Sequence, residues 1–272
     1  MTVAQALADA AHRLASVSGT PRLDAELLMA HALGVTRERL LLGRRDGAAP
    51  SAFESLVERR HAHEPVAYIT GHREFWTIDL AVGPGVLIPR PDSETLIEAA
   101  IAHWGPGGPR RILDLGTGSG ALLLAALAEW PEAVGVGVDL SDQALEVARA
   151  NAERLGMAGR AMIARGSWDA ASGGSYDLIL CNPPYVAESE PLPPDVADYE
   201  PATALYAGPD GLDEYRRIAP ALRLPAGGIA CVEIGASQAS AVCALFGAAG
   251  FQTQVKRDLA GHDRCIVLSP LK

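Results

Sequence analysis

The sequence has few cysteines, and their spacing suits neither a metal site nor a disulfide framework. The four cysteines lie far apart, with no Cys-x-x-Cys pair and no paired histidines nearby: Cys181, Cys231, Cys243 and Cys265. Structural zinc sites use such pairs at short spacing, so no metal is predicted. We expect each cysteine to be a small buried side chain in a reducing compartment.

Long apolar runs are also missing. The longest runs from Ala121 to Ala128 and ends at Glu129, whereas a membrane-spanning helix needs about 20 apolar residues. The first residues include Asp9 but no basic segment followed by a long apolar core, so no signal peptide is predicted. We therefore expect a cytoplasmic protein without a membrane partner.

Positive charge is scarce as well. The 272 residues contain 23 Lys+Arg against 33 Asp+Glu, which gives a net charge of −10. Proteins that bind a phosphate backbone usually have the opposite balance, so a direct nucleic-acid partner is disfavoured, although a local basic patch stays possible. Apolar residues make up 49% of the chain, enough for a full core, and the length suggests nearly two domains.

Residues 1–75 are predicted to form a small helical bundle. Apolar residues recur there at intervals of three or four, at Val3, Leu7, Ala10 and Leu14. This periodicity gives a helix one apolar stripe. The region has no catalytic side chains at the spacing of a known active-site motif, so we interpret it as a packing or substrate-docking domain.

Residues 76–91 are predicted to be a β-hairpin linker with its turn at Gly83-Pro84-Gly85, because the segment alternates in polarity. From residue 92 to 272, apolar strands alternate with helices of about ten residues, which indicates an α/β fold with a mostly parallel sheet between two helical layers. The last two expected strands lack a helix between them and should pair antiparallel. The loop 186–212, with five prolines, interrupts this alternation.

A glycine-rich turn follows the first strand of this region, with the residues Gly116, Thr117, Gly118, Ser119 and Gly120. Alternate glycines let the backbone approach a ligand, and the following helix offers free N–H groups. The pattern also satisfies the dinucleotide fingerprint. Asp139, at the end of the next strand, suits a ribose of either NAD or S-adenosylmethionine, or alternatively caps the following helix, a role for which Ser141 is also a candidate.

Asn182-Pro183-Pro184-Tyr185 follows the fourth strand and should lie at the same sheet edge. The prolines fix φ and push Asn182 into an extended conformation. An amide carbonyl and a backbone carbonyl would then both be able to accept hydrogens from one planar –NH2 group, with the ring of Tyr185 beside them.

These motifs resemble class I S-adenosylmethionine-dependent methyltransferases that act on a planar nitrogen. Asn-Pro-Pro-Tyr is shared by N6-adenine DNA methyltransferases and glutamine N5-methyltransferases. Further segments resemble the HemK/PrmC type, the peptide chain release factor N5-glutamine methyltransferases: Pro65–Gly71, Glu74–Trp76, Val86–Glu94, Tyr199–Pro201, Asp210–Leu212 and Glu233–Gly235. The sequence departs from that family at Gly166-Ser167-Trp168, where an acidic residue often precedes the aromatic one.

The resemblance implies a Rossmann-like seven-stranded sheet with an antiparallel last strand, in a methyltransferase domain over residues 92–272. It implies that Gly116–Gly120, Asp139, Trp168 and Asn182 bind S-adenosylmethionine, which is converted to S-adenosylhomocysteine without a metal. Substrate would contact Asn182, Pro183, Pro184 and Tyr185, of which Asn182, Pro183 and Tyr185 are the catalytic candidates. The implied substrate is the glutamine of the Gly-Gly-Gln motif in bacterial class 1 release factors, with the protein as a monomer.

Three rival functions stay open at this point, one of them a non-catalytic binding protein that uses the helical domain as its working surface. An N6-adenine DNA methyltransferase would share the Asn-Pro-Pro-Tyr loop but needs a basic cleft and a base-flipping pocket. An NAD-dependent oxidoreductase would use the glycine loop but leaves Asn-Pro-Pro-Tyr unexplained.

Overall fold

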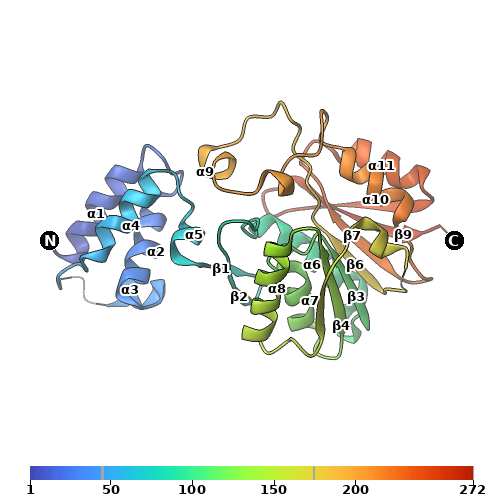
Figure 1. Cartoon of the computed structure of the whole chain (residues 1–272), viewed down its shortest axis with the longest axis horizontal. Coiled ribbons are helices and arrows are strands. Elements are labelled where there is room, and N and C mark those ends of the chain that lie inside the picture. Colours follow the sequence, from blue (N-terminus) through green and yellow to red (C-terminus); the bar gives the residue numbers. More distant parts are fainter. Residues whose placement is uncertain (44–45, 174, 272) are drawn as a thin grey trace. The chain divides into compact units, whose positions relative to one another are not determined.

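The computed structural model describes residues 1–43, 46–173 and 175–271 (Figure 1). The chain divides into two compact units, which are described separately. Unit 1 comprises Met1–His72 together with Leu192–Tyr199. Unit 2 comprises Arg73–Pro191 and Glu200–Lys272.

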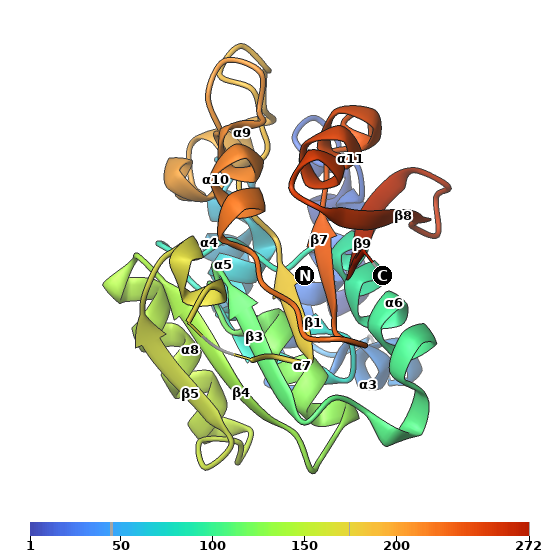
Figure 2. The ribbon, with the colours of Figure 1, turned by 90° about the vertical axis from the view of Figure 1, so that its right-hand side faces the viewer.

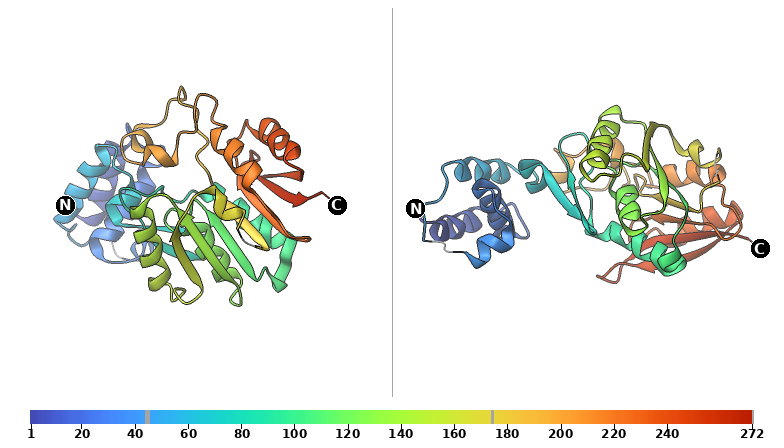
Figure 3. Two further views of the ribbon diagram at one scale, coloured as in Figure 1. Left: turned by 45° about the vertical axis from the view of Figure 1, so that its right-hand side comes forward. Right: turned by 90° about the horizontal axis from the view of Figure 1, so that it is seen from below.

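Unit 1 is helical, and its longer helices α1, α2 and α4 pack on one another (Figure 3). Its helices are α1 (Val3–Leu14), α2 (Pro21–Leu33), α3 (Arg37–Leu42), α4 (Ala52–His61), α5 (Val66–Thr70) and the single turn α9 (Pro194–Ala197). The expected stripe of α1 is buried in their shared core. Helix α1 starts at a capping box, in which the side chains of Thr2 and Gln5 each accept a hydrogen bond from the other residue's backbone N–H.

Arg60 anchors the segment Leu192–Tyr199 within unit 1. Its guanidinium is buried and donates to Asp24 at 2.8 Å and to Asp195 at 3.4 Å. The hydroxyl of Tyr199 donates to the carbonyl oxygen of Ala62 at 2.7 Å. Part of the proline-rich loop that follows Asn-Pro-Pro-Tyr therefore belongs to the helical unit.

The hairpin lies earlier in the chain than predicted. Its strands are β1 (His72–Phe75) and β2 (Ile78–Ala81), which form a two-stranded sheet. The reversal occurs at Trp76, which adopts a left-handed φ of 54° while its N–H donates to Glu94 at 2.8 Å. The prediction of a turn at Gly83–Gly85 within a 76–91 hairpin was wrong because a non-glycine residue, supported by a side chain 18 positions away, makes the turn.

Unit 2 contains a seven-stranded sheet, as predicted. Its strands are β3 (Arg111–Leu115), β4 (Val134–Asp139), β5 (Ala161–Arg165), β6 (Leu178–Cys181), β7 (Ile229–Glu233), β8 (Phe251–Arg257) and β9 (Asp263–Pro270). The order is β5-β4-β3-β6-β7-β9-β8, and β9 is antiparallel to both β7 and β8. Strands β3 to β7 pair in parallel, which confirms the mostly parallel sheet with antiparallel pairing of the last two strands.

Helices cover both faces of this sheet (Figure 2). One face carries α6 (Glu94–Trp104), α7 (Ala121–Glu129) and α8 (Asp142–Arg154), and the other carries α10 (Asp213–Ala221) and α11 (Ala239–Ala248). Short 3-10 turns complete the unit: η1 (Pro91–Ser93), η2 (Gly105–Gly107), η3 (Trp168–Ala171) and η4 (Ala202–Ala204). None of the helices in the described ranges has the length and apolarity to cross a membrane.

The strand order places a topological switch at β3. The next strand in the sequence, β4, pairs with β3 on one side, and β6 pairs with β3 on the other side. Ligands of open α/β sheets bind beyond the carboxyl ends of the strands at such a switch. The glycine loop and Asn182 follow β3 and β6, and Asp139 is the last residue of β4, so the fold brings them to one edge.

Candidate active site

The glycine loop connects β3 to α7 with three left-handed residues. Gly116, Gly118 and Gly120 have φ values of 70°, 56° and 86°. Such values strain residues with a side chain, so the loop needs glycine at these positions. The N–H groups of Gly116 and Thr117 both donate to the carbonyl oxygen of Val138, each at 2.9 Å, which fixes the start of the loop on β4.

Asp114 holds the glycine loop and the start of α7 by hydrogen bonds. Its Oδ2 accepts from the hydroxyl of Thr117 at 2.6 Å and from the N–H of Leu123 at 3.2 Å. Its Oδ1 is buried and lacks a hydrogen-bond partner in the described part of the chain. Burial raises the pKa of this carboxyl to about 7, because the charged form loses its hydration.

Asp139 lies directly against the glycine loop. One carboxylate oxygen accepts from the N–H of Gly118 and the other from the N–H of Ser141, each at 2.9 Å. The side chain of Ser141 accepts from Ala144 N and caps α8. Of the two cap candidates, Ser141 therefore fills the role, which leaves Asp139 free to face a ligand with its remaining lone pairs.

Trp168 packs against the same loop from η3. A side-chain carbon added at Gly116 would lie 3.3 Å from the ring of Trp168 and 3.9 Å from the carbonyl oxygen of Asn182. The indole N–H donates to Glu214 on α10, which fixes the ring plane. The predicted site residues of three separate loops thus meet around Gly116.

Asn182 follows β6, whose four residues are fully buried. Its Nδ2 donates to the hydroxyl oxygen of Ser93 at 3.2 Å. In the described ranges, no group donates to Oδ1 of Asn182 or to the carbonyl oxygen of Pro183. Two carbonyl acceptors at this loop are therefore unused, while the donor end of the Asn182 amide is held by the protein.

Tyr185 points its hydroxyl toward the end of β7. The hydroxyl donates to Oε1 of Glu233 at 3.3 Å, and the ring packs on the core between the sheet and α10. Burial and the nearby Glu233 raise the pKa of Tyr185 above its ordinary value, so the phenol is neutral.

Sequence reasoning did not single out Gln238, which supports the Asn-Pro-Pro-Tyr loop, or Glu200, which holds the segment around Ile88 and Arg90. Gln238 donates to the carbonyl oxygens of Tyr185 at 2.9 Å and Gly211 at 3.2 Å. Glu200, almost fully buried, accepts from the N–H of Ile88 at 3.1 Å and pairs with Arg90. No local sequence motif marks Gln238, whereas Glu200 lies within the Tyr199–Pro201 motif of the sequence analysis.

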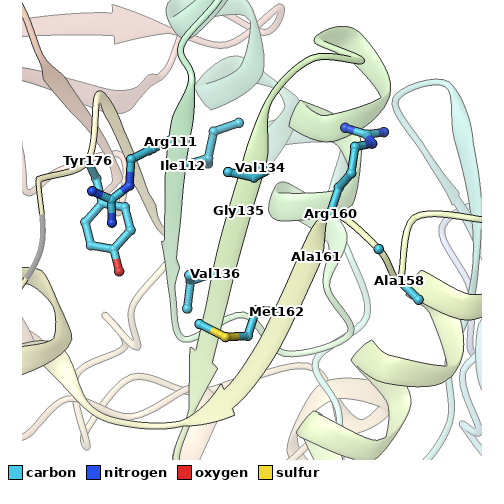
Figure 4. Close-up of a pocket in the computed structure, with 11 residues that line it drawn as sticks. Arg111, Ile112, Val134, Gly135, Val136, Ala158, Arg160, Ala161, Met162 and Tyr176 are labelled. Carbon is cyan, nitrogen blue, oxygen red and sulfur yellow. The ribbon is translucent and has the colours of Figure 1, made fainter.

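A hollow of about 390 Å³ lies at the opposite end of the sheet (Figure 4). Its lining includes the first residues of three strands, Arg111, Val134 and Ala161, and the guanidinium of Arg111 lies 5.1 Å from the ring centre of Tyr176. Every predicted site residue lies at or beyond the carboxyl ends of the parallel strands, so this hollow is separate from the site. The described ranges contain no group of three or more His, Cys, Asp or Glu side chains arranged to hold a metal.

Comparison with protein families gives two matches. Residues 5–71 match the PrmC N-terminal domain, and residues 93–194 match the methyltransferase small domain. A release factor glutamine methyltransferase from Rhodospirillum rubrum is 48% identical over 257 residues, covering 91% of this chain and 78% of that protein. A protein of the same name from Moorella thermoacetica is 42% identical over 278 residues, covering 98% of each.

Solved structures share the fold at low sequence identity. A methyltransferase from Pyrococcus furiosus has a TM-score of 0.54 and 16% identity, covering 81% of this chain and 100% of that chain. The T. thermophilus 16S rRNA N2 G1207 methyltransferase, solved with AdoMet and guanosine, has a TM-score of 0.51 and 21% identity, covering 74% of this chain and 50% of that one. These likenesses show a class I methyltransferase fold.

Proposed function

The chain belongs to the release factor glutamine methyltransferase family, and we propose that it methylates the side-chain nitrogen N5 of the glutamine in the Gly-Gly-Gln motif of bacterial class 1 release factors. The methyl donor is S-adenosylmethionine, consistent with the methyltransferase domain. The modification would tune translation termination. The product would be S-adenosylhomocysteine, and no metal would take part.

The proposal rests on one observation, the pair of unused carbonyl acceptors at Asn182 and Pro183. A carboxamide –NH2 group is planar and carries two hydrogens, so two acceptors hold it in one orientation. A carboxamide nitrogen is a poor nucleophile, because its lone pair is delocalised into its own carbonyl. Accepting both hydrogens would orient this nitrogen and stabilise the positive charge that develops on it.

The residues around the glycine loop fit S-adenosylmethionine, which supplies a methyl group already activated by the sulfonium charge. We assign Gly116, Thr117, Gly118, Ser119 and Gly120 to its methionine end, Asp139 to its ribose hydroxyls and Trp168 to its adenine. The left-handed glycines and the Trp168 ring, which a side chain at Gly116 would meet, support this assignment. Asn182 would contact both the cofactor and the glutamine.

Pro184 and Tyr185 would complete the substrate site. The ring of Tyr185 supplies an apolar wall, and its face can attract a cationic methyl group by a cation–π interaction. The neutral phenol is fixed by Glu233, so the hydroxyl is not free to act as a base.

We propose that residues 1–75 dock the release factor at a distance from the reacting glutamine. A solvent-facing glutamine side chain offers few contacts. Specificity for one glutamine among the many in other proteins must therefore come from contacts at a remote surface. Residues 76–91 would link this docking domain to the methyltransferase domain, residues 92–272. We further propose that the protein acts as a monomer in the cytoplasm, without nucleic acid as a partner.

Transfer of a labelled methyl group tests this function. The full chain is incubated with labelled S-adenosylmethionine and either intact release factor, its Gln→Ala variant at the Gly-Gly-Gln motif, or adenine-containing DNA. Label on the intact release factor alone is expected. Label on the DNA would instead support an N6-adenine methyltransferase, which the net charge of −10 and the named relatives disfavour.

A further inference from the structure

Gln238 lies beside the Asn-Pro-Pro-Tyr loop and bonds to it through both hydrogens of its side-chain amide. It follows β7 and directly precedes α11. Its Nε2 donates to the carbonyl oxygens of Tyr185 at 2.9 Å and Gly211 at 3.2 Å. Its Oε1 accepts from the N–H of Gly235 at 2.9 Å. One side chain therefore connects three separate stretches of backbone.

The partners of Gln238 allow its amide only one orientation. A backbone N–H only donates, and a backbone carbonyl only accepts. The N–H of Gly235 therefore holds the Oε1 end, and the carbonyls of Tyr185 and Gly211 hold the –NH2 end. The reverse orientation would place the amide oxygen against two carbonyl oxygens and the –NH2 group against a donor. Gln238 is thus a fixed bridge from the end of β7 to Tyr185 and Gly211.

Tyr185 and Gly211 lie on the outgoing and returning arms of the loop 186–212, whose segment Leu192–Tyr199 belongs to unit 1. The arms approach each other closely at these two residues. A side-chain carbon added at Gly211 would lie 2.4 Å from the carbonyl oxygen of Tyr185 and 2.9 Å from Nε2 of Gln238. Gly211 also has a left-handed φ of 71°, so glycine is needed there. Gln238 joins the two arms at this point.

The Asn-Pro-Pro-Tyr loop is held at both of its ends. Before its start, Cys181 in β6 pairs with both neighbouring strands, β3 and β7. At its end, the carbonyl oxygen of Tyr185 accepts from Gln238. The two prolines between fix φ but have no N–H groups with which to hold the backbone. The placement of the loop, and with it the carbonyl oxygens of Asn182 and Pro183, therefore depends on both ends.

We propose that Gln238 is a positioning residue that holds the Asn-Pro-Pro-Tyr loop in place, so that the carbonyl oxygens of Asn182 and Pro183 meet the substrate glutamine in fixed positions. This inference rests on the proposed function, since it concerns the two acceptors assigned to the glutamine amide. Gln238 acts through the backbone of Tyr185 and needs no contact with cofactor or substrate. Its loss should therefore lower kcat rather than weaken the binding of either.

Two substitutions of Gln238 test the positioning role in the full chain. Gln238→Glu keeps the size of the side chain and an oxygen for the N–H of Gly235, but a carboxylate cannot donate to the carbonyls of Tyr185 and Gly211. Gln238→Met keeps a side chain of similar length that has no hydrogen to donate. The matched control is Gln254→Glu, the same chemical change at an exposed position on β8. Steady-state kinetics with S-adenosylmethionine and release factor, cofactor affinity and thermal unfolding are measured for each variant.

We expect kcat to fall about 10- to 100-fold in both Gln238 variants, as when a substitution away from the chemistry displaces the reacting groups. Cofactor affinity and the KM for release factor should stay at their wild-type values, and Gln254→Glu should behave as the wild type. Combined with Asn182→Ala, Gln238→Glu should lower kcat by less than the product of the two single losses, because both changes act on one loop. A role in stability alone gives no such coupling.

Wild-type kcat in either Gln238 variant would overturn the proposal. So would independent losses in the combined variant, or loss of the folded state in both single variants, because these results would assign Gln238 to stability alone. A wild-type protein that binds the cofactor but fails to methylate release factor would refute the proposed function instead, so the two failures are distinguishable.

Discussion

Asn182 and Ser93 are 89 positions apart in the sequence, yet the amide Nδ2 of Asn182 donates to the hydroxyl oxygen of Ser93 over 3.2 Å. This contact occupies the donor end of a side chain whose oxygen accepts no hydrogen bond elsewhere in the described ranges. The protein therefore fixes which end of the amide a substrate meets.

Replacing Asn182 with Ala should reduce kcat about 10²- to 10³-fold, the usual cost of losing one preorganised electrostatic contact in an active site. The fold should persist, because Asn182 is only partly buried and follows a strand held by its own pairing. Methyl transfer onto release factor and circular dichroism measure the two effects. A folded variant that keeps more than about a tenth of wild-type turnover would contradict the assigned role.

Replacing Asp139 with Ala should weaken S-adenosylmethionine and S-adenosylhomocysteine alike, because both carry the ribose assigned to this carboxylate. Isothermal titration measures both affinities. Asp142→Ala is the matched control, since Asp142 is the first residue of α8 and its side chain makes an exposed ion pair with Arg165. Unchanged affinity for both ligands in Asp139→Ala would mean that the ribose is bound elsewhere.

The stability of the protein should fall as the pH rises from about 5 to 8. Asp114 and Glu233 are fully buried carboxyls whose pKa values are raised to about 7, so their neutral forms favour the folded state. That stability is complete below their unfolded pKa values near 4 and is lost as the pH rises through about 7, at a cost on the order of 3–4 kcal/mol for each group.

Thermal unfolding against pH measures this effect. Asp114→Asn should unfold at a higher temperature than the wild type at pH 8, with a smaller difference at pH 5, because asparagine keeps an oxygen for Thr117 and Leu123 without a charge. A wild type that grows more stable between pH 5 and pH 8, or a variant less stable at pH 8, would contradict the raised pKa values.

The strands and helices of unit 2 could be predicted well from the sequence, because buried parallel strands appear there as short apolar runs between helices. The glycine loop and Asn182 carried local signals, since their chemistry needs particular residues at adjacent positions. Contacts between distant segments could not be predicted. Nothing local shows that Trp76 would turn the hairpin or that Arg60 would hold Asp195. The link from Glu233 to Tyr185 likewise exists only once β6 and β7 pair.

The proposed docking role of residues 1–75 can be tested through Arg60. Replacing it with Met leaves Asp24 buried without its partner, which should destabilise unit 1 by about 3–5 kcal/mol. Cofactor affinity should be unchanged, while kcat/KM on intact release factor should fall strongly. Activity on a short Gly-Gly-Gln peptide should change little, because the peptide cannot reach a docking surface. Equal losses on both substrates would mean that the unit supports the active site instead.

The central claim, that this chain places a methyl group on a glutamine amide nitrogen, is tested most directly by tandem mass spectrometry of release factor treated with the full chain and S-adenosylmethionine. We expect one added methyl group, located on the side-chain nitrogen of the Gly-Gly-Gln glutamine, with none added by the Asn182→Ala variant. A methyl group on any other residue or atom, or an unmodified release factor despite demonstrated cofactor binding, would contradict it.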